Sequence, residues 1–252
     1  MAGHSKWANI KHRKAAQDKK RGKQFAKLIR AIESAAREAS SADPSASPSL
    51  ALAVQKARDA DVPKDNIERA CKRGAGELDG AAAYEATIYE GYGPGGVAVL
   101  VEVLTDNRNR AASDVRGAFT KAGGSFAEPG SVAFLFSRRG QVVVDALGAD
   151  EDAVLSAGLE AGLDGIDDEG EELVAWCDAG REGELRTALE AGGLVVRASG
   201  TTMVPSVTVP VEDPAVARRI LGLLDALEDN DDVQEVHANV DLSDDLLAAL
   251  DA

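Results

Sequence analysis

The 252-residue chain has few cysteine, histidine and aromatic residues. Its two cysteines, Cys71 and Cys177, cannot form a disulfide framework, and we expect two reduced, partly buried thiols. Aromatic side chains are only 4% of the residues, so the cores must be built from Ala, Val, Leu and Ile. No apolar run approaches the roughly 20 residues that span a bilayer. Neither a disulfide-stapled secreted protein nor a helical membrane protein is expected.

The amino terminus also lacks the features of common targeting segments. It is basic, but no apolar segment follows, so it does not match a secretory signal. A transit peptide is usually rich in Ser and Arg, whereas this segment is dominated by Lys and contains Gly3, Trp7 and Asn9. We therefore expect a cytoplasmic protein.

Charge is divided unevenly along the chain. Residues 1–30 hold ten Lys or Arg residues against one acid, a net charge of +9, and the other 222 residues carry −24. This separation directs the amino terminus towards a polyanion and keeps the remaining surface away from one. Trp7 and His12 add planar groups that can stack on bases. A solubilising tail is the alternative. The predicted nucleic-acid-binding residues here are Lys6, Trp7, Lys11, His12, Arg13, Lys14, Lys19, Lys20, Arg21, Lys23, Lys27 and Arg30.

Apolar spacing indicates a small helical domain after this basic arm. Residues 1–23 offer no apolar face, so we expect them to be mobile until they meet a partner. From Phe25, apolar residues at i, i+3, i+4 and i+7 predict an amphipathic helix. A Ser-rich loop at 40–49 precedes a second helix near 50–60. Pro63 opens a third helix, with Ile67, Ala70 and Cys71 facing inward and Gly74 at its end.

After Gly80 the hydrophobic period changes from helical to strand-like. Segments within 138–200 follow the order β-α-β-β-α-β, the ferredoxin-like split unit. Flanking segments supply a second copy, with strands expected at 97–104, 131–137, 203–211 and 233–241 and helices at 109–122 and 213–228. A further strand is expected at 84–90, joined to 97–104 by GYGPGG. The predicted fold class is α+β: a small N-terminal helical domain followed by two ferredoxin-like α/β-sandwich domains, one inserted in the other. The expected boundaries are a basic mobile arm at 1–23, a helical domain at 24–78, a discontinuous first ferredoxin-like domain at 79–137 plus 201–245, and an inserted acidic domain at 138–200.

No residue pattern points to catalysis, a metal or a cofactor. Gly91, Gly93 and Gly96 match G-x-G-x-x-G, but an alternating β-branched segment follows instead of a helix, so a hairpin connection is favoured over a nucleotide site. His4 and His12 lie among cations, which disfavour a bound metal ion. Adjacent acids occur without a nucleophile nearby. We predict a protein that is not an enzyme and has no cofactor, no metal site and no small-molecule substrate.

A second candidate contact is the segment TDNRNRAASDVR at 105–116. It joins a strand to a helix start, and so places Asn107, Arg108, Asn109 and Arg110 beside free backbone N–H groups that suit a phosphate. The alternative is a helix cap with arginines paired to local acids. We expect this turn to lie across an interdomain gap from the basic arm.

Four segments closely resemble the YebC/PmpR family, whose members are described as probable transcriptional regulators. They are MAGHSKWANIKHRKAAQDKKRGKQFAKLIR at the amino terminus, VPKDNIERACKRG (62–74), YEGYGPGGVAVLVEVLTDNRNRAASDVRGAFTKAGG (89–124) and LEDNDDVQEVHANVD (227–241). The sequence departs from the family at Gly117 and Ala122, where His is frequent. The resemblance implies an α+β protein of three domains that binds DNA in the cytoplasm.

The resemblance also leaves alternatives open. Relatives similar to the mitochondrial translational activator of cytochrome c oxidase imply a ribosome-associated RNA-binding translation factor that helps elongation through proline-rich stretches. No recognition helix at a two-fold spacing is evident, which weakens sequence-specific operator binding. A protein-interaction adaptor that uses the acidic domains is a third reading. The expected partners are DNA or ribosomal or messenger RNA, and with RNA the ribosome, but no membrane.

Overall fold

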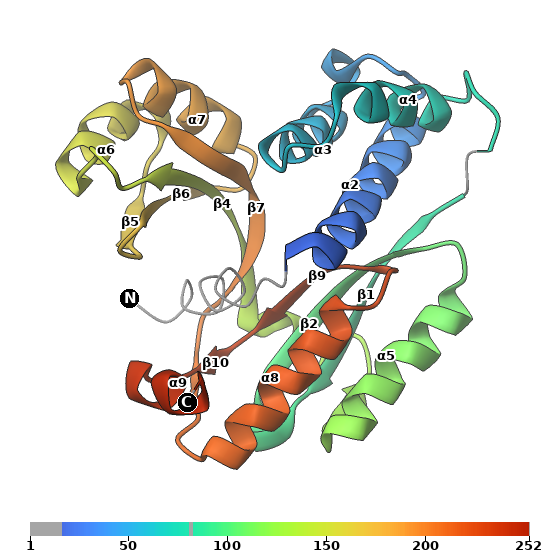
Figure 1. The fold of residues 1–252 in the computed structure, drawn as a ribbon, viewed down its shortest axis with the longest axis vertical. Coiled ribbons are helices and arrows are strands. Elements are labelled where there is room, and N and C mark those ends of the chain that lie inside the picture. The colour runs from blue at the N-terminus through green and yellow to red at the C-terminus, as the bar shows by residue number, and fades with distance from the viewer. Residues whose placement is uncertain (1–16, 81–82, 252) are drawn as a thin grey trace.

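The computed structural model describes residues 17–80 and 83–251, and it begins with a helical domain (Figure 1). Its elements are α2 (Gln17–Ala39), the short 3-10 helix η1 (Pro44–Ala46), α3 (Pro48–Asp59) and α4 (Lys64–Gly74). Helix α2 begins at Gln17 and not near Phe25, so residues 17–23 of the expected mobile arm are helical. The predicted inward faces meet in one core that includes Ile32, Ala36, Leu50, Val54, Ile67 and Cys71.

Local sequence explains the ends and the close packing of these helices. The Ser47 side chain accepts a hydrogen bond from the Leu50 N–H at 3.1 Å, and Pro48 occupies the first helical position. Helix α4 ends at Gly74, which is buried against α2. A Cβ at Gly74 would lie 2.4 Å from the carbonyl oxygen of Glu33. Only glycine therefore allows α4 to approach α2 this closely.

The inserted segment forms a ferredoxin-like sheet. Its elements are β4 (Phe136–Asp145), α6 (Glu151–Gly158) with the short helix η4 (Leu159–Ala161), β5 (Gly165–Asp168), β6 (Glu172–Asp178), α7 (Glu182–Ala191) and β7 (Val196–Pro205). The strand order is β5-β6-β4-β7, and every neighbouring pair is antiparallel. Buried Val142, Leu185 and Leu189 belong to its core. The prediction of a split β-α-β-β-α-β unit is confirmed.

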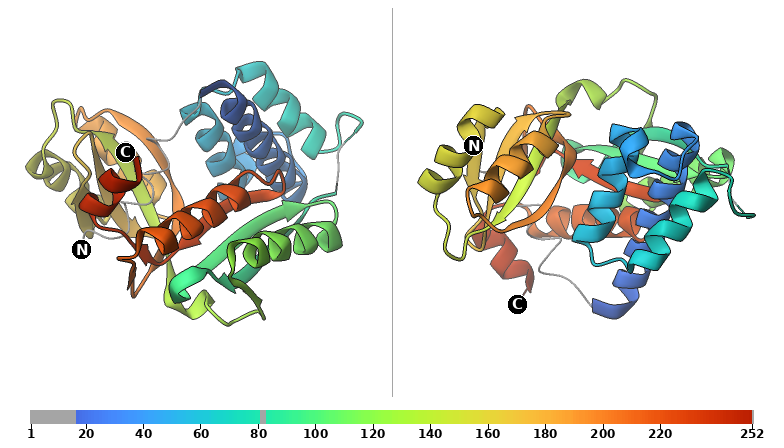
Figure 2. Two further views of the ribbon diagram at one scale, coloured as in Figure 1. Left: turned by 60° about the horizontal axis from the view of Figure 1, so that its bottom comes forward. Right: turned by 90° about the horizontal axis from the view of Figure 1, so that it is seen from above.

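A second four-stranded sheet has the order β3-β1-β2-β9. Its strands are β1 (Glu85–Tyr92), β2 (Ala98–Thr105), β3 (Ser125–Ala127) and β9 (Val233–Ala238), and helices α5 (Arg108–Ala122) and α8 (Pro214–Glu228) lie side by side on one face (Figures 1 and 2). Phe119, Ile220 and Leu224 fill the core between sheet and helices. The α+β fold class, with a helical part followed by sheet-containing domains, is confirmed.

The sequence predicted strands at 131–137 and 203–211 in this sheet, and the structure has neither there. Within 131–137 the chain forms a short helix, η3 (Ala133–Leu135), and 203–211 contains the end of β7. The backbone N–H groups of Val132 and Ala133 donate to the carboxylate of buried Glu90 at 2.6 and 2.8 Å, so they do not pair with a strand. Strands β4 and β7 pair with each other from Phe136↔Pro205 to Val144↔Val196, across the expected boundaries at 138 and 200.

Strands β1 and β3 take the places of the two missing strands, and β1 forms a hairpin with β2. The pairing runs from Glu85↔Thr105 to Tyr92↔Ala98, and the connection contains the short helix η2 (Pro94–Gly96). Gly95 and Gly96 have φ of 77° and 80°, a conformation that glycine adopts readily. The predicted hairpin at GYGPGG is therefore confirmed, and β2 rather than a helix follows it.

The carboxyl-terminal part and the thiols complete the described fold. A short parallel pair joins β8 (Val209–Pro210) to β10 (Val240–Asp241), and α9 (Asp244–Asp251) follows. Cys71 and Cys177 are free and buried, as expected. None of the helices in residues 17–80 and 83–251 combines the length and apolarity that crossing a membrane requires.

Candidate nucleic-acid interface

The predicted arm residues fall into four groups. Lys6, Trp7, Lys11, His12, Arg13 and Lys14 lie outside the described residues. Lys19 and Lys20 belong to the beginning of α2. Arg21 is exposed and lies 3.8 Å from the carboxylate of Asp61. Both side chains of this ion pair are exposed to solvent, so the pair stabilises the fold little.

The remaining three arm cations bind an acidic turn at residues 228–232, which joins α8 to β9. Lys23 Nζ donates to the Asp229 carbonyl oxygen at 3.0 Å, and Lys27 Nζ donates to the Glu228 carbonyl oxygen at 2.5 Å. Arg30 donates to the Asp231 carbonyl oxygen. These carbonyls lie at and just beyond the carboxyl end of α8, where the helix dipole favours cations. We call Lys23, Lys27 and Arg30 the turn-bound cations.

Asp232 is the centre of this contact. Its carboxylate is 9% exposed and accepts hydrogen bonds from Thr105 Oγ1 at 3.0 Å and from Arg110 at 2.7 Å, while Arg30 lies 3.4 Å from it. Arg30 of α2 and Arg110 of α5 therefore meet at one acid. Residues 1–16 of the basic arm lie outside the described residues, so the expectation that the 105–116 turn lies across a gap from that arm stays a prediction.

The 105–116 turn has local partners for most of its predicted side chains. Asn107 caps α5 by accepting a hydrogen bond from the Arg110 N–H at 3.1 Å. Arg108 pairs with Glu85 at 3.0 Å, and Arg110 also pairs with Asp106 at 2.8 Å. The hydrogen bonds that Arg110 donates to Asp232 and Asp106 hold its pKa above the usual range. Asn109 is exposed. These contacts match the alternative of a cap with paired arginines, and a nucleic-acid role for the turn stays a prediction.

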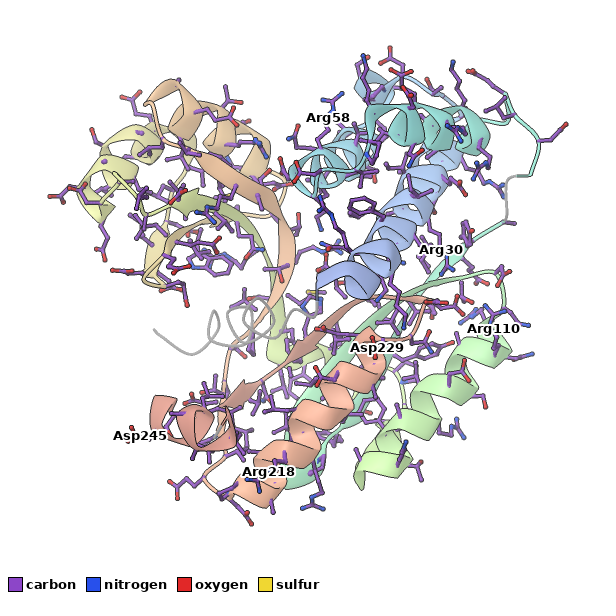
Figure 3. All side chains as sticks on the ribbon, viewed as in Figure 1. Arg30, Arg58, Arg110, Arg218, Asp229 and Asp245 are labelled. Atoms are coloured by element: carbon purple, nitrogen blue, oxygen red, sulfur yellow. The ribbon has the colours of Figure 1, made fainter. Side chains whose placement is uncertain are left out.

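Three exposed cations of the helical domain have no salt bridge within the part of the chain that the structure describes. Arg58 on α3 and Arg69 and Lys72 on α4 are exposed, and we call them the unpaired cations. In Figure 3, Arg58 lies well away from Asp229 of the acidic turn. Sequence reasoning missed these three because it concentrated on the amino-terminal run. The signal was present in the segment VPKDNIERACKRG, whose basic residues lie on the solvent side of α4.

Charged contacts also join the helical domain to both sheets. Lys56 of α3 pairs with Glu235 of β9 at 2.8 Å, and Arg186 of α7 pairs with Asp59 of α3 at 2.7 Å. Burial disfavours the ammonium of Lys56, but Glu235 and other nearby acids outweigh burial and raise its pKa. His237 of β9 is buried beside this junction, with Nε2 3.4 Å from a carboxylate oxygen of Glu102.

The sheet-containing domains offer phosphate little attraction. The segment 138–200 carries a net charge of −10, and residues 201–252 also carry −10. Among the described residues, no three His, Cys, Asp or Glu side chains gather as metal ligands would. The charge of both sheet-containing domains therefore repels phosphate.

Comparison with known proteins divides the chain between the helical domain and the two sheet-containing domains. Residues 5–77 match the model of the TACO1/YebC protein N-terminal domain, and residues 84–240 match that of the TACO1/YebC second and third domain. A relative from Beutenbergia cavernae is 56% identical over 252 residues, covering 100% of this chain and 99% of the relative. One from Salinispora arenicola is 52% identical over 250 residues, covering 99% and 100%.

Both relatives are named "Probable transcriptional regulatory protein". The crystal structure of a conserved hypothetical protein from Aquifex aeolicus aligns with a TM-score of 0.82 at 41% identity, covering 92% of this chain and 95% of that one. The chain therefore belongs to the TACO1/YebC family.

Proposed function

We propose that this chain is a non-enzymatic regulator of gene expression in the cytoplasm that binds nucleic acid through its amino-terminal segment and the unpaired cations of its helical domain. The observation that carries the proposal is the division of charge, +9 over residues 1–30 against −24 over the rest. Such a division gives attraction at one end and repulsion elsewhere, so that a phosphate backbone contacts one part of the surface. The name shared by the relatives supports a role in regulation and favours DNA as the ligand.

RNA is the alternative nucleic acid, in a translation factor associated with the ribosome. A cationic segment on an acidic body suits insertion between RNA helices, since the body stays away from the phosphate surface. Both ligands use the same cations, and so binding measurements with each decide between them.

A protein-interaction adaptor is the second candidate, and exposed apolar residues of the acidic inserted domain favour it. Leu147 is 91% exposed and Leu159 is 62% exposed, near Glu151, Asp152 and Glu160 in the sequence. Exposed apolar side chains among acids suit a partner with apolar and basic groups. An adaptor of this kind keeps its partner when the amino-terminal segment is removed.

The test compares the full chain with a chain that lacks residues 1–16. This deletion starts the protein at the first residue of α2 and retains every described contact. It removes Lys6, Lys11, Arg13 and Lys14, so the slope of log K against log[salt] should flatten by about 3 units for single-stranded RNA and about 4 for duplex DNA. Unchanged affinity for both ligands, with the fold retained by circular dichroism, would refute the proposal.

A competition titration then decides between the two nucleic acids. Labelled duplex DNA is bound first, and unlabelled single-stranded RNA of equal length is added at constant salt. Release of the labelled DNA at an RNA concentration equal to or below that of the DNA supports the RNA alternative. Release only at a large excess of RNA over DNA supports DNA as the ligand.

A further inference from the structure

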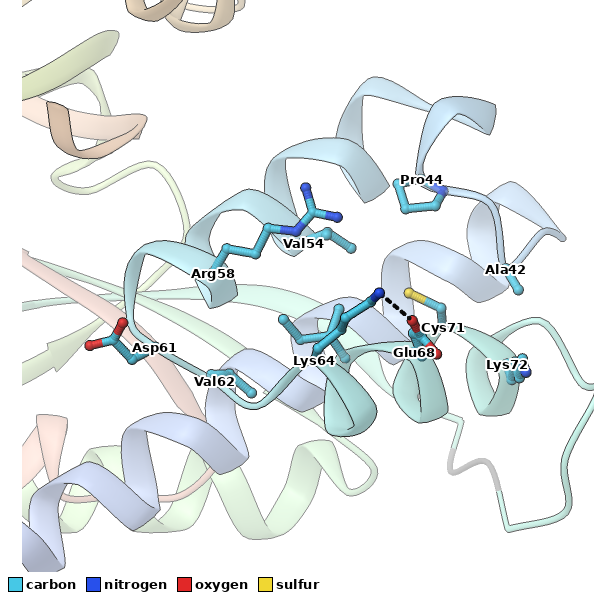
Figure 4. A pocket seen from close by; sticks show the side chains of 11 residues that line it. Ala42, Pro44, Val54, Arg58, Asp61, Val62, Lys64, Glu68, Cys71 and Lys72 are labelled. Carbon is cyan, nitrogen blue, oxygen red and sulfur yellow. Dashed lines mark ion pairs between the residues drawn. The ribbon is translucent and has the colours of Figure 1, made fainter. Parts of the chain in front are cut away.

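A cavity of about 730 Å³ lies in the helical domain between the 42–44 loop, α3 and α4 (Figure 4). Its volume falls within the roughly 300–1,000 Å³ typical of small-molecule sites. The cavity does not involve the acidic turn or either sheet. No part of the function proposed above assigns it a role.

The inner wall of the cavity is apolar. Val54, Val62, Ile67 and Cys71 line it, and each is at most 5% exposed, so the floor is the rigid core of the domain. A flat apolar body placed on this floor would cover side chains that are already fixed by packing. Burial of that body is favourable because it removes apolar surface from water.

The rim of the cavity carries more positive than negative charge. Arg58, Lys64 and Lys72 are its cations, and Asp61 and Glu68 are its acids. Both acids already have a cation nearby, since Glu68 lies 3.6 Å from Lys64 and Asp61 lies 3.8 Å from Arg21. Arg58 and Lys72 remain available for an anion, as neither has a salt bridge to another described residue.

We propose that this cavity binds a nucleotide, with the planar base against Val54 and Ile67 and the phosphate against Arg58 at the rim. The charge of the rim selects an anion, and the Arg58 guanidinium can form paired hydrogen bonds with phosphate oxygens. The carboxylates of Asp61 and Glu68 can accept hydrogen bonds from amino groups at the base edge. A simple acyl chain would leave those carboxylates without such donors, so a heterocycle fits better.

Two sources supply this chemistry, an unstacked nucleotide of a bound strand and a free nucleotide. The first source rests on the proposed function, because the strand must be held by the same domain. The second is independent of it. The experiment therefore uses cytidine monophosphate, adenosine monophosphate and a single-stranded oligonucleotide as separate ligands for the full chain.

Cys71 reports on occupancy of the cavity, and Cys177 is the internal control. Burial raises the pKa of both thiols, that of Cys177 to about 11, so both react slowly. Cys71 lines the cavity, whereas Cys177 lies in the core of the inserted domain. A ligand in the cavity should slow iodoacetamide labelling of Cys71 and leave that of Cys177 unchanged, as quantified by peptide mass spectrometry. Calorimetry of the same ligands gives the affinity without dependence on thiol reactivity.

Arg58→Ala is the diagnostic variant, and Arg37→Ala is its matched control. Arg37 is a partly exposed arginine in the last turn of α2, in the same domain; it does not line the cavity and is not one of the unpaired cations. Loss of a charge-assisted hydrogen bond predicts that Arg58→Ala weakens nucleotide affinity by about tenfold or more, while Arg37→Ala leaves it within about twofold. Both variants should melt as the parent does, because neither arginine has a salt bridge to another described residue.

The outcomes separate the two sources and the two proposals. Protection of Cys71 by the free monophosphates identifies a nucleotide site, and protection by the oligonucleotide alone, dependent on Arg58, identifies a strand nucleotide. If the oligonucleotide binds the full chain but no ligand protects Cys71 or depends on Arg58, the cavity proposal is wrong and the proposed function stands. If the oligonucleotide does not bind at all and the monophosphates give neither heat nor protection, both proposals fail.

Discussion

The helical domain carries two groups of cations that differ in their surroundings. The turn-bound cations, Lys23, Lys27 and Arg30, already contact carbonyl and carboxylate oxygens of the 228–232 turn. The unpaired cations, Arg58, Arg69 and Lys72, have no salt bridge to another described residue. A phosphate must displace an existing partner from the first group, but it finds the second group solvated and available. Equal formal charge therefore does not imply equal affinity for a nucleic acid.

The largest expected effect is on stability, from Asp232→Ala. This change removes the carboxylate that Thr105, Arg30 and Arg110 share, and leaves a buried hydroxyl and two arginines without it. We expect the free energy of unfolding to fall by about 2–4 kcal/mol, measured by urea denaturation. Nucleic-acid affinity should match that of the control.

The control is the adjacent Asp231→Ala, which removes the same charge from an exposed side chain. Its stability should stay within about 0.5 kcal/mol of the parent. Equal stability of the two variants would show that the Asp232 contacts do not fasten α2 to the second sheet.

A pair of lysine variants separates the two groups most sharply. Lys27→Ala removes a hydrogen bond to the carbonyl of Glu228 and should lower stability by about 1 kcal/mol without changing affinity. Lys72→Ala should leave stability unchanged and flatten the salt dependence of binding by about 0.7–0.9 units per lost phosphate contact. Both variants lose one positive charge, and so each is a control for the other. The reverse pattern would mean that the acidic turn releases α2 when nucleic acid binds.

The smallest effect is expected from the double change Arg108→Ala with Arg110→Ala. Because Glu85, Asp106 and Asp232 already pair with these arginines, we expect a lower melting temperature and an affinity within about twofold of the parent. A loss of about tenfold or more in affinity, without a change in melting, would restore the 105–116 turn as a nucleic-acid contact.

Local sequence patterns predicted the helices of the amino-terminal domain and the inserted sheet. The stripe from Phe25 to Ile32 and the split unit within 138–200 depend on neighbours in the chain, so periodicity detects them. The absence of a strand at 131–137 could not be predicted in this way. It depends on hydrogen bonds from the Val132 and Ala133 N–H groups to Glu90, a residue more than 40 positions earlier in the chain.

The sequence predicted that the amino-terminal segment is positively charged. It did not predict which of the charged side chains already have a partner in the folded protein. The excess of cations in residues 1–30 can be counted in the sequence. Their pairing cannot, because Arg30 and the acid that it meets are 202 residues apart. Asn107 was predictable as a cap from its place before a helix, since that interaction spans only three residues.

Photo-crosslinking with peptide mapping tests the central claim most directly. The full chain is bound to a single-stranded RNA that carries 4-thiouridine, and to duplex DNA that carries 4-thiothymidine, and the cross-linked peptides are identified by mass spectrometry. The account predicts cross-links to peptides from residues 1–16 and from α4, around Arg69 and Lys72, with none to the 138–200 domain. Cross-links confined to the acidic sheet-containing domains would contradict it.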